Sequence, residues 1–179
     1  MSEYYTMKIA GLQRNLEKFP VSDKLDIAAF IIFGDVELTV KASEELLKKA
    51  PEFDFILTPE AKSIPIAYEM ARQSGKPYIV ARKGVKVYMR NPLEVTVTSI
   101  TTQKEQKLYL GETEVNLIKG KRVLIVDDVI STGESLSSVR ELVKKAGATE
   151  AAACAILAEG DAAERDDIIF LEKLPLFFK

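Results

Sequence analysis

The sequence predicts an α/β fold in which helices flank a central, mostly parallel β-sheet. Val123–Val126 is an apolar run without alternation, as expected for a strand buried on both faces of a parallel sheet. Residues 151–158 form a second such run, separated from the first by a helical pattern. Residues 53–81 follow the order strand, helix, strand, which predicts parallel strands joined by a right-handed crossover. With 179 residues, we expect a single domain spanning residues 1–179.

The composition excludes several classes of function. The formal net charge of −2 gives no indication of a nucleic-acid or anionic-membrane partner. No apolar run approaches the ~18 residues that span a bilayer, and the N-terminus lacks the apolar segment of a signal peptide. Histidine is absent, which rules out Ser-His-Asp and Cys-His catalysis, and the single Cys154 cannot form an internal disulfide. We therefore expect a cytoplasmic protein that relies on carboxylates, Lys and Arg, hydroxyls and an oxygen-loving metal.

The first 50 residues contain possible short strands and one helix. Leu25–Phe33 is strongly apolar and is predicted to be a strand entering the core, followed by a turn at Gly34 and Asp35. Thr39 is the predicted N-cap of a helix that Pro51 closes.

The loop at residues 58–63 is the first candidate ligand contact. It follows a strand predicted at Phe53–Leu57 and opens onto a helix that ends at Gly75. Open α/β sheets bind ligands at this edge, beyond the carboxyl ends of the strands. The alternative is that Ser63 only caps the helix while Lys62 is solvated.

A basic turn follows the next strand, predicted at Tyr78–Ala81. Arg82, Lys83 and Lys86 bring three positive charges to the same edge, where they would counter the charge of an anionic ligand. The alternative is that this turn is simply solvated.

Residues 95–110 predict a hairpin with a long polar tip. Two β-rich arms, Val95–Ile100 and Lys107–Leu110, enclose the polar residues 101–106. Exposed polar loops of this kind are candidates for mobile lids.

The stretch Val123–Ser135 contains more candidate ligand-binding residues than any other part of the sequence. The buried strand is expected to end at two adjacent carboxylates, Asp127 and Asp128, and a hydroxyl-rich turn then opens a helix. Unpaired backbone N–H groups at that helix start favour an anion, and Gly133 allows it to approach closely. The carboxylates repel the same anion and suit sugar hydroxyls or a hydrated Mg²⁺. Together these groups outline a site for ribose 5-phosphate. The alternative, a strand end followed by a helix cap at Ser131, explains one hydroxyl and not the whole ordered set.

This stretch resembles the phosphoribosyl pyrophosphate (PRPP) signature of type I phosphoribosyltransferases. The resemblance implies a central parallel sheet flanked by helices, a small hood and a flexible hairpin lid at about residues 95–110. The hood would come from parts of residues 1–35 and 165–179, and a last strand is expected at Asp167–Leu171. It also implies Mg²⁺ as cofactor, PRPP and a purine base as substrates, and a homodimer.

The resemblance also assigns site residues. The carboxylates of Asp127 and Asp128 would hold the ribose hydroxyls and, mainly through PRPP and water, the metal. Lys104 and Glu105 of the lid are added to them as candidate catalytic residues. The residues that would bind PRPP are Asp127, Asp128, Val129, Ile130, Ser131, Thr132, Gly133, Glu134 and Ser135. Those that would bind pyrophosphate are Glu60, Ala61, Lys62, Ser63, Arg82, Lys83 and Lys86.

The identity of the base is harder to predict. Glu60 and Ala61 match the pyrophosphate loop of adenine phosphoribosyltransferases, so adenine is favoured, whereas the Thr-rich and Lys-rich lid is similar to that of the xanthine enzymes. Xanthine or hypoxanthine/guanine phosphoribosyltransferase is the alternative, as is a non-catalytic regulatory protein that senses PRPP. A dinucleotide-binding enzyme is excluded, because no G-x-G-x-x-G motif follows any strand.

Overall fold

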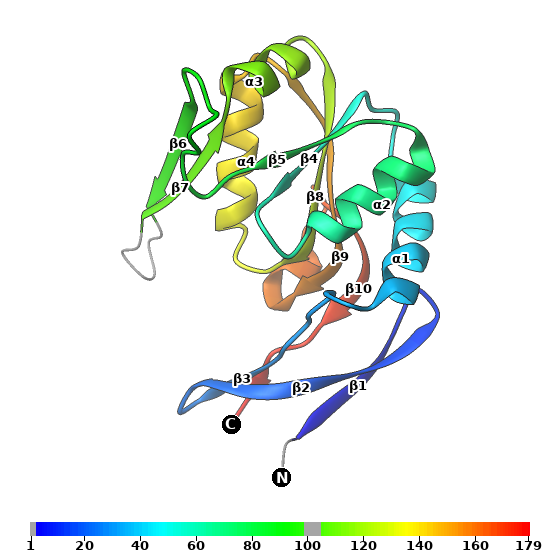
Figure 1. The fold of residues 1–179 in the computed structure, drawn as a ribbon. Helices are drawn as coiled ribbons and strands as arrows, with labels where there is room; N and C mark the ends of the chain where they lie inside the picture. Colours follow the sequence, from blue (N-terminus) through cyan, green and yellow to red (C-terminus); the bar gives the residue numbers. More distant parts are fainter. Residues whose placement is uncertain (1–2, 99–104) are drawn as a thin grey trace.

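The computed structural model describes residues 3–98 and 105–179, which form an α/β fold (Figure 1). Within these residues, five strands form the central sheet: β4 (Phe55–Pro59), β5 (Tyr78–Ala81), β8 (Arg122–Ile130), β9 (Thr149–Glu159) and β10 (Ile169–Leu174). Their order across the sheet is β10-β9-β8-β4-β5, and all neighbouring pairs are parallel. The predicted fold class is confirmed.

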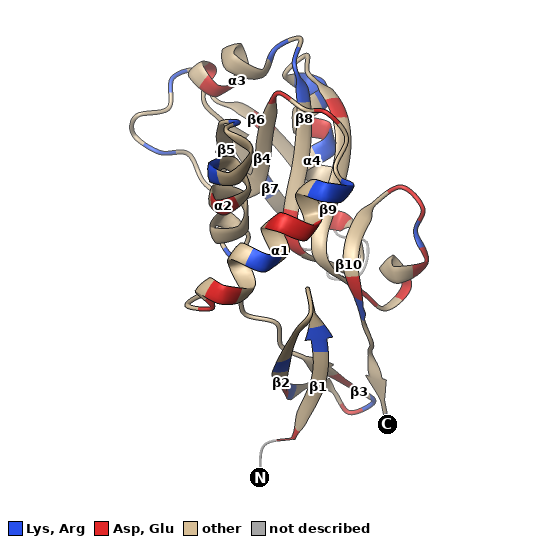
Figure 2. Cartoon of the chain, turned by 90° about the vertical axis from the view of Figure 1, so that its right-hand side faces the viewer, with Lys and Arg blue, Asp and Glu red and all other residues tan. Residues whose placement is uncertain are grey.

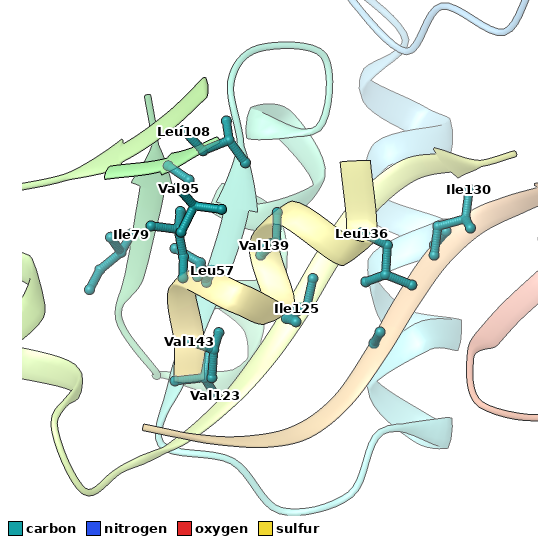
Figure 3. Close-up of a cluster of buried hydrophobic side chains, with 14 of the residues drawn as sticks. Leu57, Ile79, Val95, Leu108, Val123, Ile125, Ile130, Leu136, Val139 and Val143 are labelled. Carbon is teal, nitrogen blue, oxygen red and sulfur yellow. The ribbon is translucent and has the colours of Figure 1, made fainter. Parts of the chain in front are cut away.

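Helices cover both faces of this sheet. They are α1 (Val36–Lys49), α2 (Ile64–Ser74) and α4 (Glu134–Lys145). Val123 and Ile125 of β8 pack in one apolar core with α4, as Figure 3 shows, whereas Leu124 and Val126 belong to a second core with α1 and α2. The unbroken apolar run of β8 is therefore explained by burial on both faces.

The predicted hairpin is present and lies against α4. Its arms are β6 (Leu93–Thr98) and β7 (Glu105–Leu110), and a short helix, α3 (Glu112–Ile118), follows. Val95 and Leu108 point into the same core as α4 (Figure 3). Two backbone hydrogen bonds of 2.9 and 2.8 Å join Arg82 and Tyr109, so the hairpin is tied to the end of β5.

A second, antiparallel sheet lies at one end of the molecule (Figures 1 and 2). Its strands are β1 (Tyr4–Ile9), β2 (Leu12–Ser22), β3 (Leu25–Ala28) and β11 (Phe177–Phe178), in the order β1-β2-β3-β11. The rings of Phe177 and Tyr5 pack edge to face, with their centroids 5.1 Å apart. Lys18 Nζ lies 4.4 Å from the centroid of the Phe177 ring. The two ends of the sequence thus meet in one sheet.

Several predicted strand boundaries are wrong. The run Leu25–Phe33 is a strand only over Leu25–Ala28, in the second sheet, because beyond Ala29 the backbone no longer pairs with β2. Phe30 and Ile32 still reach the core, which accounts for the apolar signal. The strands predicted at residues 53–57 and 167–171 begin two residues later, at Phe55 and Ile169.

The predicted N-cap of α1 is also wrong. The helix begins at Val36, and its N-cap is Asp35, whose carboxylate accepts a 3.1 Å hydrogen bond from the Leu38 N–H. Thr39 lies in the first turn instead, where its hydroxyl donates to the Asp35 carbonyl at 2.7 Å. Asp35 also pairs with Arg14 of β2 at 2.6 Å, so it joins the second sheet to α1.

The acidic pair does not end its strand, contrary to prediction. β8 continues through Asp127 and Asp128 to Ile130, because Val129 and Ile130 still pair with Leu157 and Ala158 of β9. Both carboxylates therefore project from regular strand backbone.

In Figure 2, acidic and basic residues are interspersed over α1 and the loops. Among the described residues, every helix is too short or too polar to cross a membrane.

Replacing Asp35 with alanine removes both the N-cap of α1 and the ion pair with Arg14. We expect Asp35→Ala to lower the free energy of unfolding by about 1–2 kcal/mol, as for other lost caps. Glu37→Ala is the control, since Glu37 also pairs with Arg14 but is exposed and caps nothing, and it should cost less than about 0.5 kcal/mol. Urea denaturation measures both, and equal losses would show that Asp35 does not act as a cap.

Candidate active site at the carboxyl edge of the sheet

Three segments meet at the carboxyl edge of the central sheet. They follow β4, β5 and β8, which are neighbouring parallel strands, so their carboxyl ends lie side by side. Lys62 from the first segment lies 3.5 Å from Asp128, two residues before the end of β8, and Glu60 lies 3.5 Å from Arg82 of the second. The structure thus brings together the acidic pair and the two loops that the sequence analysis singled out.

The acidic pair has one ion-pair partner among the described residues, the Lys62 ammonium near Asp128. Asp127 accepts the backbone N–H of Asp128 at 2.9 Å, and burial together with the neighbouring Asp128 carboxylate raises the pKa of Asp127 to about 8. Asp128 is buried, and within the described residues its Oδ2 accepts no hydrogen bond. The Lys62 ammonium lies 3.5 Å from this oxygen and forms an ion pair with it, without a hydrogen bond. The Oδ2 atom of Asp128 is therefore suited to accept a hydroxyl group or to face a cation.

The turn at residues 131–135, which we call the α4 turn, is open to an anion. Gly133 is the N-cap of α4 with φ of +83°, a conformation that favours glycine, and it offers no side-chain acceptor to the first helical N–H groups. Thr132 reaches the Glu134 N–H only at 3.5 Å. A helix start without a side-chain cap and the positive end of the helix dipole favour an anionic group.

Glu60 serves to hold the basic turn. Its carboxylate accepts the Lys83 N–H at 3.0 Å, and this bond, with the charges of Arg82, Lys86 and Lys83, holds the pKa of Glu60 below its usual range. Lys83 itself is exposed, and the Glu60–Ala61 peptide bond is cis. Within the described residues, the buried Arg82 Nε donates no hydrogen bond. The basic turn thus keeps donors for a ligand.

Ser63 neither caps α2 with its side chain nor points to solvent. Its hydroxyl is buried, donates to the Pro59 carbonyl at 2.9 Å and accepts from the Thr58 hydroxyl at 2.7 Å. The capping alternative is therefore wrong for the side chain, which forms its hydrogen bonds with the end of β4 instead.

A cavity of about 220 Å³ lies between the hairpin, the basic turn and the α4 turn. Its lining residues are Lys83, Gln106, Lys107, Leu108 and Ser135. The lid candidate Lys104 lies outside the described residues, and so does the side chain of Glu105. Gln106 is not among the site residues predicted from the sequence. The alternation of side chains along a strand could have indicated it, because it places Gln106 on the same side of β7 as the buried Leu108.

The donor set suits Mg²⁺ held through a substrate. Mg²⁺ is typically bound by one or two carboxylates together with substrate phosphates and waters. Asp127 and Asp128 supply two carboxylates, and one of their oxygens is buried without a hydrogen bond. In the described part of the chain, no three acidic or Cys side chains gather as a metal site.

Comparison with known proteins gives consistent results. The family model described as "Phosphoribosyl transferase domain" matches residues 36–175. The hypoxanthine/guanine phosphoribosyltransferase of Methanococcus voltae is 34% identical over 142 residues, which cover 79% of this chain and 70% of that protein. The protein of the same name from Methanocella arvoryzae is 34% identical over 129 residues, and the chain spans 61% of its length. The adenine phosphoribosyltransferase structure from Thermoanaerobacter pseudethanolicus is similar with a TM-score of 0.67 at 23% identity, covering 79% of this chain and 84% of that one.

The raised pKa of Asp127 predicts a pH-dependent stability. In the unfolded chain this carboxyl titrates near 3.8, and in the folded protein near 8, so the folded state binds more protons between these values. The stabilisation from the neutral carboxyl is complete below pH 3.8 and is lost as the pH rises through 8. Urea denaturation at pH 5 and pH 8 should therefore show a larger loss of stability for the wild type than for Asp127→Asn.

The exposed Asp23, in the turn between β2 and β3, provides the control. Asp23→Asn should keep the pH dependence of the wild type. If Asp127→Asn keeps it too, the carboxyl of Asp127 is not the group responsible.

Proposed function

The chain belongs to the phosphoribosyl transferase family, and we propose that it transfers the 5-phosphoribosyl group of PRPP to a purine base. The observation that carries this proposal is the order of groups along one sheet edge. A pair of carboxylates, Asp127 and Asp128, stands between an anion-binding turn and a basic turn. This order matches a substrate with a phosphate at one end, a diol in the middle and a pyrophosphate at the other end.

Each part of PRPP has a complementary group in this proposal. The α4 turn binds the 5′-phosphate through its backbone N–H groups, and Asp127 and Asp128 accept hydrogen bonds from the ribose hydroxyls. The pyrophosphate lies toward the loop 60–63 and the basic turn, where Arg82, Lys83 and Lys86 offset its charge. Lys62, now 3.5 Å from Asp128, turns to the pyrophosphate when the ribose occupies the carboxylates.

The reaction is a substitution at the anomeric carbon. A nitrogen of the base forms the new C–N bond, the C–O bond to pyrophosphate breaks with its electron pair leaving on the pyrophosphate, and the base loses a proton to solvent. Asp127 and Asp128 would hold Mg²⁺, mainly through PRPP and water, and the ion would supply positive charge that stabilises the leaving group. The protein contributes by positioning and by electrostatic stabilisation, which require no histidine.

The hairpin completes the proposed mechanism as a lid. The transition state has a cation-like ribosyl carbon that water would trap, so the site must exclude water during the reaction. Lys104 and Glu105 stay candidate catalytic residues of this lid. Gln106 and Lys107 join them, because they line the cavity between the hairpin and the basic turn.

Two observations favour different bases. The Glu60–Ala61 pair resembles the adenine enzymes, whereas relatives that are 34% identical are named for hypoxanthine and guanine. The adenine enzymes of similar structure are only 17–23% identical and therefore support the fold alone. We favour hypoxanthine or guanine as the base, with adenine as the second candidate. The homodimer and the cytoplasmic location stay predictions, the first of them open to light scattering.

Pyrophosphate release from PRPP tests the proposal directly. With Mg²⁺ present, we expect release with hypoxanthine or guanine, and slower or no release with adenine and xanthine. Release with adenine alone would assign the chain to the adenine enzymes. PRPP binding by calorimetry without release for any base would make it a PRPP-binding regulator.

The carboxylate pair is tested by binding. The double variant Asp127→Asn, Asp128→Asn should weaken PRPP binding at least about 100-fold, because hydrogen bonds to charged acceptors contribute about 1.5–3 kcal/mol each. A melting temperature close to that of the wild type would show that the fold is kept, and Asp23→Asn is the matched surface control. Unchanged PRPP affinity in the double variant would contradict the site assignment.

A further inference from the structure

The α4 turn has a neighbour from a distant part of the sequence. Arg165 follows the short 3₁₀ helix Gly160–Glu164, and its guanidinium lies against Gly133. The approach is so close that a Cβ on Gly133 would collide with Nη1 of Arg165. Gly133 thus leaves room for a positive charge beside the turn.

A carboxylate holds this guanidinium in a fixed orientation. Arg165 donates from Nε and Nη2 to the two oxygens of Asp167, at 2.8 and 2.7 Å. Arg140 of α4 also donates to Asp167, at 2.6 Å to the carboxylate and 3.1 Å to the backbone carbonyl. The two guanidinium groups, that of Arg165 first, hold the pKa of Asp167 well below its usual range. Asp167 is therefore charged, and it links Arg165 to the helix that bears the turn.

The remaining donor of Arg165 faces the turn. Nε and Nη2 are used by Asp167, and among the described residues Nη1 donates no hydrogen bond. Nη1 is also the atom that adjoins Gly133. Because a guanidinium is planar and rigid, fixing one edge on a carboxylate also fixes the direction of the other N–H groups. Arg165 is only 30% exposed, so this orientation is supported by its surroundings.

We propose that Arg165 contacts the 5′-phosphate group of the substrate, and that Asp167 and Arg140 position it for this contact. The inference rests on the proposed function, which assigns the phosphate to the α4 turn. It adds a charged donor to a subsite that otherwise consists of backbone N–H groups and hydroxyls. A guanidinium matches phosphate geometry and forms charge-assisted hydrogen bonds.

Calorimetry with two separate probes, ribose 5-phosphate and pyrophosphate, tests this role. Arg165→Gln should weaken the binding of ribose 5-phosphate about 10- to 100-fold and change that of pyrophosphate less than about 2-fold. Arg165→Lys should fall between the wild type and Arg165→Gln, because it keeps the charge and loses the fork. Lys173→Ala is the matched control: Lys173 pairs with Glu164 at 2.7 Å beside Arg165 but is 61% exposed, and both affinities should be those of the wild type.

Three results would overturn the proposal in distinguishable ways. Wild-type affinity for both probes in Arg165→Gln would mean that Arg165 does not contact the phosphate. An equal loss for both probes, in the Gln and the Lys variants, would mean that Arg165 only supports the fold. A wild type that binds neither probe would overturn the proposed function itself. If Arg165→Gln does not fold, Arg165→Lys decides, with a selective loss of ribose 5-phosphate binding as the supporting result.

Discussion

The parallel pairing of β8 with β4 and β9 is the constraint on which the site depends. It buries β8 on both faces and aligns the carboxyl ends of three strands at one edge. It also holds Asp127 and Asp128 in regular strand backbone close to the carboxyl end of β8. Burial, together with the neighbouring Asp128 carboxylate, raises the pKa of Asp127, and Asp128 pairs with Lys62. Both features make the pair suited to hydroxyls and a cation.

Much of the central sheet was predictable because its signals are local. The run Val123–Val126, the crossover at residues 53–81 and the hairpin each depend on a few consecutive residues, and all three are present in the structure. The end of β8 was not predictable, because the pairing of Val129 and Ile130 with β9 decides it rather than the polarity of Asp127 and Asp128. Similarly, Asp35 rather than Thr39 caps α1, in a position that Arg14 of another sheet supports.

Within the candidate site, the residue types were predictable and their roles were less so. Glu60 and Ser63 occur in a segment that the resemblance assigns to pyrophosphate, yet Glu60 binds the Lys83 N–H and Ser63 is buried beneath the loop. Both roles depend on partners that only the folded chain brings near. Arg165 gives no signal in the sequence, since it belongs to no motif and adjoins Gly133 only through the packing of the segment after β9.

The strand Phe177–Phe178 has a consequence for the order in which the protein forms. It pairs with β3, and Phe177 lies opposite Asp26, about 150 residues earlier in the chain. During translation at about 5–20 residues per second, the N-terminal strands emerge from the ribosome on the order of 10–30 s before this partner exists. Until then one edge of β3 has no partner strand, so the second sheet is completed only after this last strand has been made.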